Sequence, residues 1–177
     1  MSRIIAAALA AACGAALATP AAAATTKAEV FLASPSGVGG PAGRVMFRDA
    51  PGGATVRVDL YGLPPGQHGF HIHQNPSCGP GEVNGAMAPA GAAGGHYDPM
   101  GTAMHRGPYG KGHLGDLPFL TIDANGSEHE TLVAPRITDV TQLKGHSVVI
   151  HAGGDNYADQ PQPLGGGGAR IACGVIG

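Results

Sequence analysis

The chain has 177 residues, enough for one domain or two very small ones, and its 31 glycines and 15 prolines disfavour helical bundles and coiled coils. Only 12% of residues are charged and the formal net charge is −2, which excludes a charged disordered tail and argues against nucleic-acid binding. The nine histidines nearly equal the ten lysines and arginines together, and this much imidazole in a neutral, glycine-rich chain suggests a metal site.

Residues 1–24 have the three-part pattern of a secretory signal peptide. One basic residue precedes an apolar run at 4–18, and Ala22-x-Ala24 supplies a cleavage site. The run is shorter than the roughly 20 residues that a membrane-spanning helix needs. We therefore expect export to the periplasm or beyond, with a mature domain at 25–177. Processing as a lipoprotein anchored through Cys13 is the alternative.

The exported chain predicts seven or eight short strands. The candidates are residues 28–33, 43–48, 55–61, 67–74, 117–123, 130–133, 147–151 and a last strand that begins at 170. In 55–61, apolar and polar residues alternate with the period of a half-buried strand. Turns are expected at 34–41 and 50–53, an Asn-Gly hairpin turn at 124–127, and a short helical turn near 138–143. This spacing favours an all-β antiparallel sandwich or barrel.

Residues 75–116 contain eleven glycines and five prolines and have no sustained periodicity. So long an irregular stretch inside a compact domain needs something other than a hydrophobic face to order it. A metal ion and a disulfide would serve. In an oxidising compartment Cys78 and Cys173 most simply pair, and two free buried thiols are the alternative.

Two histidines lie at i and i+2 in the predicted strand HGFHIH. Alternation along a strand places the side chains of His71 and His73 on one face, which makes half of a metal site. His151 ends the strand VVIH and would complete a set of three or four imidazoles. Nitrogen ligands without thiolate suit Cu(II) as well as zinc.

The irregular stretch supplies a second set of ligands. His96, His105, His113 and Asp116 are separated by 9, 8 and 3 positions and would close a tetrahedral zinc site, which is typical of a structural ion. Zinc would also supply ordering energy to this stretch. Without His96, each set has three ligands. Because an imidazolate has two nitrogens, His96 could serve both sets as a bridge.

Six motifs at 68–177 closely resemble the copper,zinc superoxide dismutase family in its bacterial exported branch. They are HGFHIH (68–73), GGHYDP (94–99), HLGDLP (113–118), VVIHAGGDN (148–156), DQPQPLGGGGAR (159–170) and ACGVIG (172–177). The resemblance implies an eight-stranded Greek-key β-barrel with long metal-binding and disulfide-tethered loops. It also implies the pairing of Cys78 with Cys173.

The resemblance assigns roles to individual residues. It implies copper bound by His71, His73, His96 and His151, and zinc bound by His96, His105, His113 and Asp116. Asp155 would hydrogen-bond one ligand imidazole of each metal, and Arg170 beside copper would receive the substrate anion. His68 is then structural, and we expect His129 and His146 to be ordinary surface residues.

The implied activity is the dismutation of superoxide to dioxygen and hydrogen peroxide by a copper redox cycle, in which His96 also carries a proton. Zinc would be structural and would tune the bridging His96, and the enzyme would protect against exogenous or periplasmic superoxide. A homodimer is the possible assembly. The loop 153–168 departs from the charged loop of the eukaryotic branch, because it has two aspartates and no lysine or glutamate. Lys111 or Arg106 could steer superoxide instead.

Two other functions are compatible with part of this pattern. A non-catalytic copper or zinc carrier would need the imidazoles but neither Arg170 nor a bridge, and Cu(I) carriers usually use methionine or cysteine. A zinc hydrolase built on the pair His71 and His73 would need a general-base carboxylate and an open zinc position. The residues that follow the pair, Gln74-Asn75-Pro76, include no acid.

Overall fold

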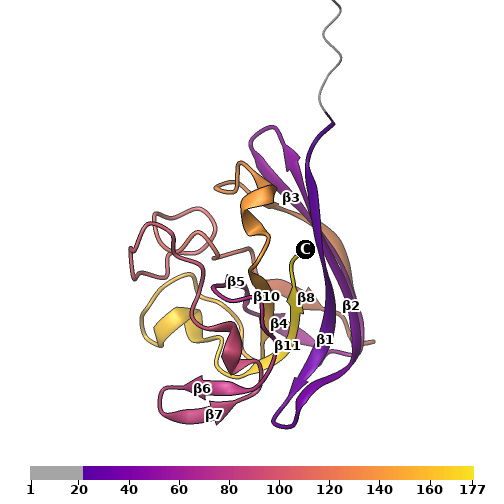
Figure 1. The fold of residues 1–177 in the computed structure, drawn as a ribbon, viewed down its shortest axis with the longest axis vertical. Coiled ribbons are helices and arrows are strands. Elements are labelled where there is room, and N and C mark those ends of the chain that lie inside the picture. Colours follow the sequence, from indigo (N-terminus) through magenta and orange to yellow (C-terminus); the bar gives the residue numbers. More distant parts are fainter. Residues whose placement is uncertain (1–21) are drawn as a thin grey trace, which may run out of the picture.

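A computed structural model describes residues 22–177, which fold into short antiparallel strands joined by long loops (Figure 1). The strands are β1 (Thr25–Ser34), β2 (Gly37–Ala50), β3 (Gly53–Leu60), β4 (Gly66–His68), β5 (Phe70–His73), β6 (Gly81–Val83), β7 (Ala86–Ala88), β8 (Leu120–Ile122), β9 (Glu128–Ala134), β10 (Ser147–His151) and β11 (Arg170–Val175). Single 3₁₀ turns lie at η1 (Gly91–Ala93), η2 (Val140–Leu143) and η3 (Pro163–Gly166).

Seven strands form one curled sheet in the order β5-β10-β11-β1-β2-β3-β9, and β4 pairs with β8. β4 and β5 are separated only by Gly69 and form one continuous segment. Its first part, β4, pairs with β8, and its second part, β5, pairs with β10. Counted as one strand, it completes the predicted eight-stranded antiparallel Greek-key barrel. Figure 1 shows β1 and β2 on one side of the barrel and the long loops gathered on the other.

The barrel is filled by the inward residues of alternating strands. In β3, Val56, Val58 and Leu60 are at most 1% exposed, whereas Arg57 between them is exposed. Phe47, Phe70 and Ile72 join the same core. Burying one such side chain contributes about 1.5–3 kcal/mol, so the alternation seen in the sequence accounts for the orientation of the sheet.

Several strand boundaries differ from the sequence-based expectations. The predicted turn at 34–41 is wrong beyond its first residues, because Ser34 Oγ donates to the carbonyl of Gly37 and β2 starts there. Two register shifts between β1 and β2 accommodate the glycines and Pro41 within paired strands. The predicted strands at 67–74 and 117–123 are wrong in extent, since the first is broken at Gly69 and only Leu120–Ile122 of the second is a strand.

Two Asn-Gly signals and one helical turn have different outcomes in the structure. The Asn-Gly turn closes through the Asp123 amide, which donates to the carbonyl of Ser127, but β8 and β9 then pair with β4 and β3 rather than with each other. Residues 75–116 contain the β6–β7 ribbon, which we did not predict although Asn84-Gly85 is a hairpin signal. The helical turn expected near 138–143 is present as η2.

The predicted signal peptide at 1–24 lies mostly outside the described residues, as does Cys13, so the domain division remains a prediction. Between residues 22 and 177, no helix has the length and hydropathy needed to cross a membrane.

Candidate metal centre

Two neighbouring strands present three of the candidate ligands. β5 pairs with β10 so that His71 lies opposite Val149 and His73 lies opposite Ser147, and His151 ends β10. All three side chains are buried, with exposures of 0%, 0% and 6%. The predicted placement of His71 and His73 on one face of a strand therefore brings them beside His151.

The remaining ligands arrive on the long segment between η1 and β8, which we call the ligand loop (residues 94–119). It runs along the edge of β5 that β10 leaves free. Isolated backbone bridges join His73 to His96 and His71 to Asp116. The Ile72 amide donates to the carbonyl of Gly115 at 2.9 Å, and its carbonyl accepts from the Tyr97 amide at 2.8 Å. Backbone pairing with β5 thus places the ligands of the loop beside those of the strands.

The side chains form two groups that share one residue. The four-histidine group is His71, His73, His96 and His151, and the mixed group is His96, His105, His113 and Asp116. Within each group one ligand atom per residue lies within 4.8 Å of all the others. Every member is buried, the most exposed being His113 at 7%. His96 belongs to both groups, as the count of ligands in the sequence suggests.

The donor atoms left unpartnered inside these groups fit metal ions. Within the described chain, four buried side-chain polar atoms have no hydrogen-bond partner, and three are ring nitrogens of candidate ligands: His71 Nδ1, His96 Nε2 and His105 Nδ1. An orphaned polar atom in a protein interior is costly unless something binds it. One cation bound in each group would satisfy all three.

Distances within the groups agree with this fit. Ligand atoms held ~2.0 Å from a tetrahedral ion lie about 3.3 Å apart. His73 Nε2 and His151 Nε2 are separated by 3.3 Å. Asp116 Oδ1 lies 3.0 Å from His96 Nδ1, 3.0 Å from His105 Nδ1 without a hydrogen bond, and 3.3 Å from His113 Nδ1. The mixed group supplies four oxygen and nitrogen ligands of kinds that bind zinc, and it leaves no open position, as in a structural zinc site.

Electrostatics divide the histidines into two classes. Burial lowers the pKa of His96 to about 3, with a further contribution from the His71 ring. Burial also lowers the pKa of His71, and it places the pKa values of His73 and His151 well below the usual value. The four-histidine group is therefore uncharged at neutral pH, and neutral imidazole is the form that binds metal.

His105 has the opposite charge state. Burial lowers its pKa, but the adjacent carboxylates of Asp116 and Asp155 outweigh burial and raise it to about 9. The pKa values of both carboxyls fall, because the adjacent histidine rings, above all His105, overcome the effect of their own burial. In the metal-free protein His105 therefore holds a proton that a metal ion has to displace.

Asp155 links the two groups from outside. Its side chain is fully buried; Oδ2 accepts from His71 Nε2 and Oδ1 from His105 Nε2, each at 2.7 Å. Both rings must therefore present Nδ1 to their own group. Gly165 lies directly over this carboxylate, and a Cβ there would come 2.0 Å from Asp155 Oδ1.

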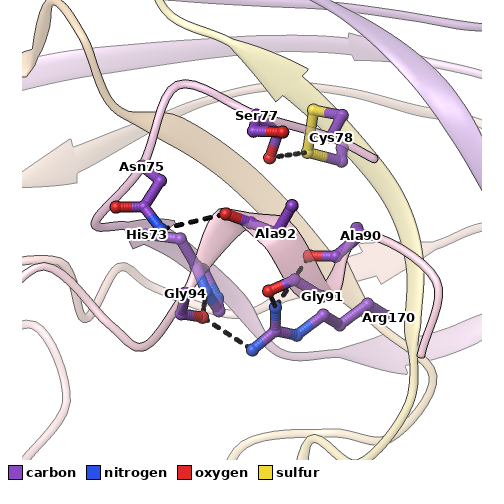
Figure 2. Close-up of a disulfide and its surroundings, with 10 residues drawn as sticks. His73, Asn75, Ser77, Cys78, Ala90, Gly91, Ala92, Gly94 and Arg170 are labelled. Atoms are coloured by element: carbon purple, nitrogen blue, oxygen red, sulfur yellow. Dashed lines mark hydrogen bonds between the residues drawn. A yellow bond between two sulfur atoms is a disulfide. The ribbon is translucent and has the colours of Figure 1, made fainter. Parts of the chain in front are cut away.

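Arg170 is held by the backbone that follows β7. Its Nη1 donates to the carbonyls of Ala90 and Gly91 at 2.7 and 3.3 Å, and its Nη2 donates to the carbonyl of Gly94 at 2.7 Å (Figure 2). His73 Nδ1 donates to the same Gly94 carbonyl at 2.9 Å. This bond leaves His73 Nε2 free to bind a metal and couples the arginine to a candidate ligand.

The predicted disulfide is formed between Cys78 and Cys173, with a Cα–Cα distance of 5.6 Å. Cys173 lies on β11 three residues after Arg170 and packs in one cluster with Ala90 and Ala93. The bridge therefore ties the segment that holds Arg170 to the strand that carries Arg170.

The other predicted histidines have separate environments. His68 is 3% exposed and outside both groups; its Nδ1 lies 2.6 Å from the carbonyl of His151 and its Nε2 2.8 Å from that of Pro64. His129 is exposed and lies 2.8 Å from Asp59. The expectation of an ordinary surface residue is wrong for His146, which is half-buried, donates to the carbonyl of Gln74 and packs at a tilt against the Tyr97 ring.

Other residues near the groups carried no recognised signal in the sequence. Arg136, which follows β9, donates to the carbonyls of Gly112 and His113 at 2.7 and 2.8 Å and so fixes the end of the ligand loop. Lys111 and Arg106 are both exposed on that loop, and their steering role remains a prediction. A lone arginine or a loop lysine has no local pattern that reveals its tertiary partner.

Comparison with known proteins agrees with this geometry. The family model for copper/zinc superoxide dismutase (SODC) matches residues 41–176. The chain is 52% identical to a Superoxide dismutase [Cu-Zn] of Brucella abortus, over 90% of this chain and 92% of the relative. It is 47% identical to that of Escherichia coli K12, with the same coverage.

Solved structures extend the likeness to the fold. The structure of the Brucella abortus Cu/Zn superoxide dismutase matches with a TM-score of 0.84 and 52% identity, covering 87% of this chain and all of that one. The monomeric copper, zinc superoxide dismutase from Salmonella enterica matches with a TM-score of 0.76 and 48% identity, at the same coverage. The chain therefore belongs to the copper/zinc superoxide dismutase family.

Proposed function

We propose that the protein dismutates superoxide to dioxygen and hydrogen peroxide, with copper held by His71, His73, His96 and His151 and zinc held by His96, His105, His113 and Asp116. The observation that carries this proposal is the ring of His96, which belongs to both groups: Nδ1 lies 3.0 Å from Asp116 Oδ1, and Nε2 is buried without a hydrogen-bond partner. A metal carrier would have no need of a shared ring. A hydrolase built on His71 and His73 would need an open zinc position, whereas the four-histidine group that contains this pair already supplies four ligands.

The residues around the proposed metals have distinct tasks. Copper supplies one-electron exchange with superoxide, and zinc supplies fixed positive charge. His96 holds and returns a proton at Nε2, because Nδ1 is engaged on the side of Asp116. Reduction of superoxide to hydrogen peroxide consumes two protons, and this nitrogen delivers one while solvent delivers the other. Asp155 keeps the Nδ1 atoms of His71 and His105 turned toward their groups.

Arg170 receives the substrate anion. A guanidinium has five N–H donors, and the three bonds to backbone carbonyls fix its plane without using all of them. The remaining donors can bind superoxide in a charge-assisted manner. Because Arg170 and His73 share the carbonyl of Gly94, an anion bound to Arg170 lies beside the four-histidine group.

Metal analysis combined with a dismutation assay tests the proposal. We expect one copper and one zinc per mature chain, rapid dismutation, and loss of affinity for both metals in His96→Ala. His129→Ala is the matched control, since this exposed histidine lies outside both groups. Zinc alone, with no dismutation after copper is supplied, would contradict the proposal and favour the carrier or the hydrolase.

We also propose that residues 1–24 direct export to the periplasm, where the enzyme removes exogenous or periplasmic superoxide. The three-part sequence pattern supports this, and a disulfide is compatible with an oxidising compartment. N-terminal sequencing of the protein from a periplasmic fraction should begin at Thr25. A lipid on Cys13 would indicate the lipoprotein alternative. Sedimentation of the mature protein would show whether it is a homodimer or a monomer.

A further inference from the structure

Three alternate residues of one loop reach the ligand loop. The carboxylate loop (residues 152–169) connects β10 to β11, and its positions 155, 157 and 159 all contact residues 105–119. Asp155 Oδ1 accepts from His105 Nε2 at 2.7 Å, and Asp159 Oδ2 accepts from the His105 backbone amide at 3.1 Å. His105 is therefore held at its ring and at its main chain by the same loop.

Tyr157 stands between these two aspartates and closes the contact. Its amide donates to Asp155 Oδ1 at 2.8 Å, and its hydroxyl accepts from the Phe119 amide at 3.1 Å. Its side chain packs against Gly107, where a Cβ would come 2.5 Å from Tyr157 Cγ, and its ring stacks on the Phe119 ring at a centroid distance of 5.6 Å. Tyr157 has a left-handed φ of 58°, which persists where the surroundings fix it.

We propose that Tyr157 and Asp159 are positioning residues for the zinc ion. The inference rests on the proposed zinc ligands, and it concerns how the chain retains the ion. A ring held only at Nε2 can still move with its own backbone. The Asp159 bond immobilises that backbone, and Tyr157 holds Gly107 two residues later, so His105 cannot leave zinc unless the two loops separate.

Release of zinc measures this directly. Changing a residue that supports a metal ligand typically costs about 10–100-fold in metal affinity. In protein loaded with copper and zinc, we expect Asp159→Ala to release zinc to an excess of chromophoric chelator about tenfold faster than wild type. Asp159→Asn keeps an oxygen that accepts from the His105 amide and should release zinc within about twofold of the wild-type rate, which separates the hydrogen bond from the charge.

Matched controls separate positioning from general destabilisation. Asp123, like Asp159, accepts from the backbone, but its two amide donors lie in the β8–β9 turn. Zinc release from Asp123→Ala should therefore stay at the wild-type rate. Tyr157→Phe keeps the ring on Gly107 and should be milder than Tyr157→Ala. The Tyr157 pair tests the same contact independently if Asp159→Ala fails to fold. With cobalt in the zinc site, Asp159→Ala should alter the visible spectrum and Asp159→Asn should restore it.

The outcomes distinguish this inference from the proposed function. The positioning role alone would be overturned if the wild-type protein retains zinc and neither Asp159→Ala nor Tyr157→Ala releases it faster. Equal acceleration in Asp123→Ala would also overturn it, because the effect would then be one of global stability. Wild-type protein that holds no zinc at all would overturn the proposed zinc site itself.

Discussion

Removal of the disulfide should lower both stability and turnover. The bridge joins residues 95 positions apart. The loop-entropy relation for a closed loop of that length gives about 4.7 kcal/mol at 25 °C, and native disulfides usually deliver about 2–5 kcal/mol. The double variant Cys78→Ala/Cys173→Ala should therefore lose about 2–5 kcal/mol of its free energy of unfolding. Part of this loss comes from Cys173 itself, because alanine buries less apolar surface at that buried position.

Urea unfolding of the metal-free protein is the appropriate assay, since bound metal would add its own contribution to the free energy of unfolding. Reduction of the wild-type protein provides the matched control, because it breaks the bridge without changing a residue. A loss below about 1 kcal/mol in both cases would refute the entropic reasoning.

The same variant tests how the bridge acts on the site. The segment that the bridge tethers supplies the carbonyls of Ala90, Gly91 and Gly94 to Arg170. When that segment loosens, Arg170 loses its fixed orientation, so kcat/KM should fall while the copper and zinc contents of the loaded protein stay unchanged. Full activity in the folded double variant would show that these carbonyls do not depend on the bridge.

Two substitutions and two pH dependences test the residues of the site. Arg170→Ala should lower kcat/KM by at least about tenfold with both metals retained, because a hydrogen bond to a charged group contributes about 1.5–3 kcal/mol. The rate of this variant should also depend less on ionic strength than the wild-type rate. An unchanged rate would remove the anion-binding role. Asp116→Ala should lose zinc and expose residues 75–116 to proteolysis before strand content falls, and a protease-resistant loop would contradict this. Zinc affinity should rise as pH rises toward 9, because binding displaces the proton of His105, whose pKa is about 9. In the metal-free protein the raised pKa of His105 contributes stability that is complete below about pH 6.5 and is lost as pH approaches 9. Urea unfolding at several pH values measures this loss, and the free energy of unfolding of His105→Asn should not show it.

The parts of the fold that the sequence predicted are those set by local periodicity. Val56, Val58 and Leu60 alternate with polar residues, and their strand is buried on one face as expected. The pair His71 and His73 obeys the same rule, which is why half of the four-histidine group could be predicted from spacing alone. The extent of β2 could not be predicted, because its glycines and Pro41 are typical of a turn. In the structure, two register shifts against β1 accommodate these residues within paired strands.

The rest of the site depends on contacts between segments far apart in the chain. Nothing local places the ligand loop along the free edge of β5, where His96 meets His73 and Asp116 meets His71. Arg136 likewise has no motif and is recognised only by the carbonyls that it reaches. Spacing could suggest a shared His96 only by counting ligands, whereas coordinates were needed to place Nδ1 beside Asp116 and to find Nε2 buried without a hydrogen-bond partner.

The central claim is that one imidazole serves two different metal ions. Anomalous diffraction from crystals of the copper- and zinc-loaded protein, collected on both sides of each absorption edge, would test it most directly. We predict a copper peak facing His96 Nε2 and a separate zinc peak facing His96 Nδ1. A single peak, or a His96 ring turned away from both ions, would contradict the account.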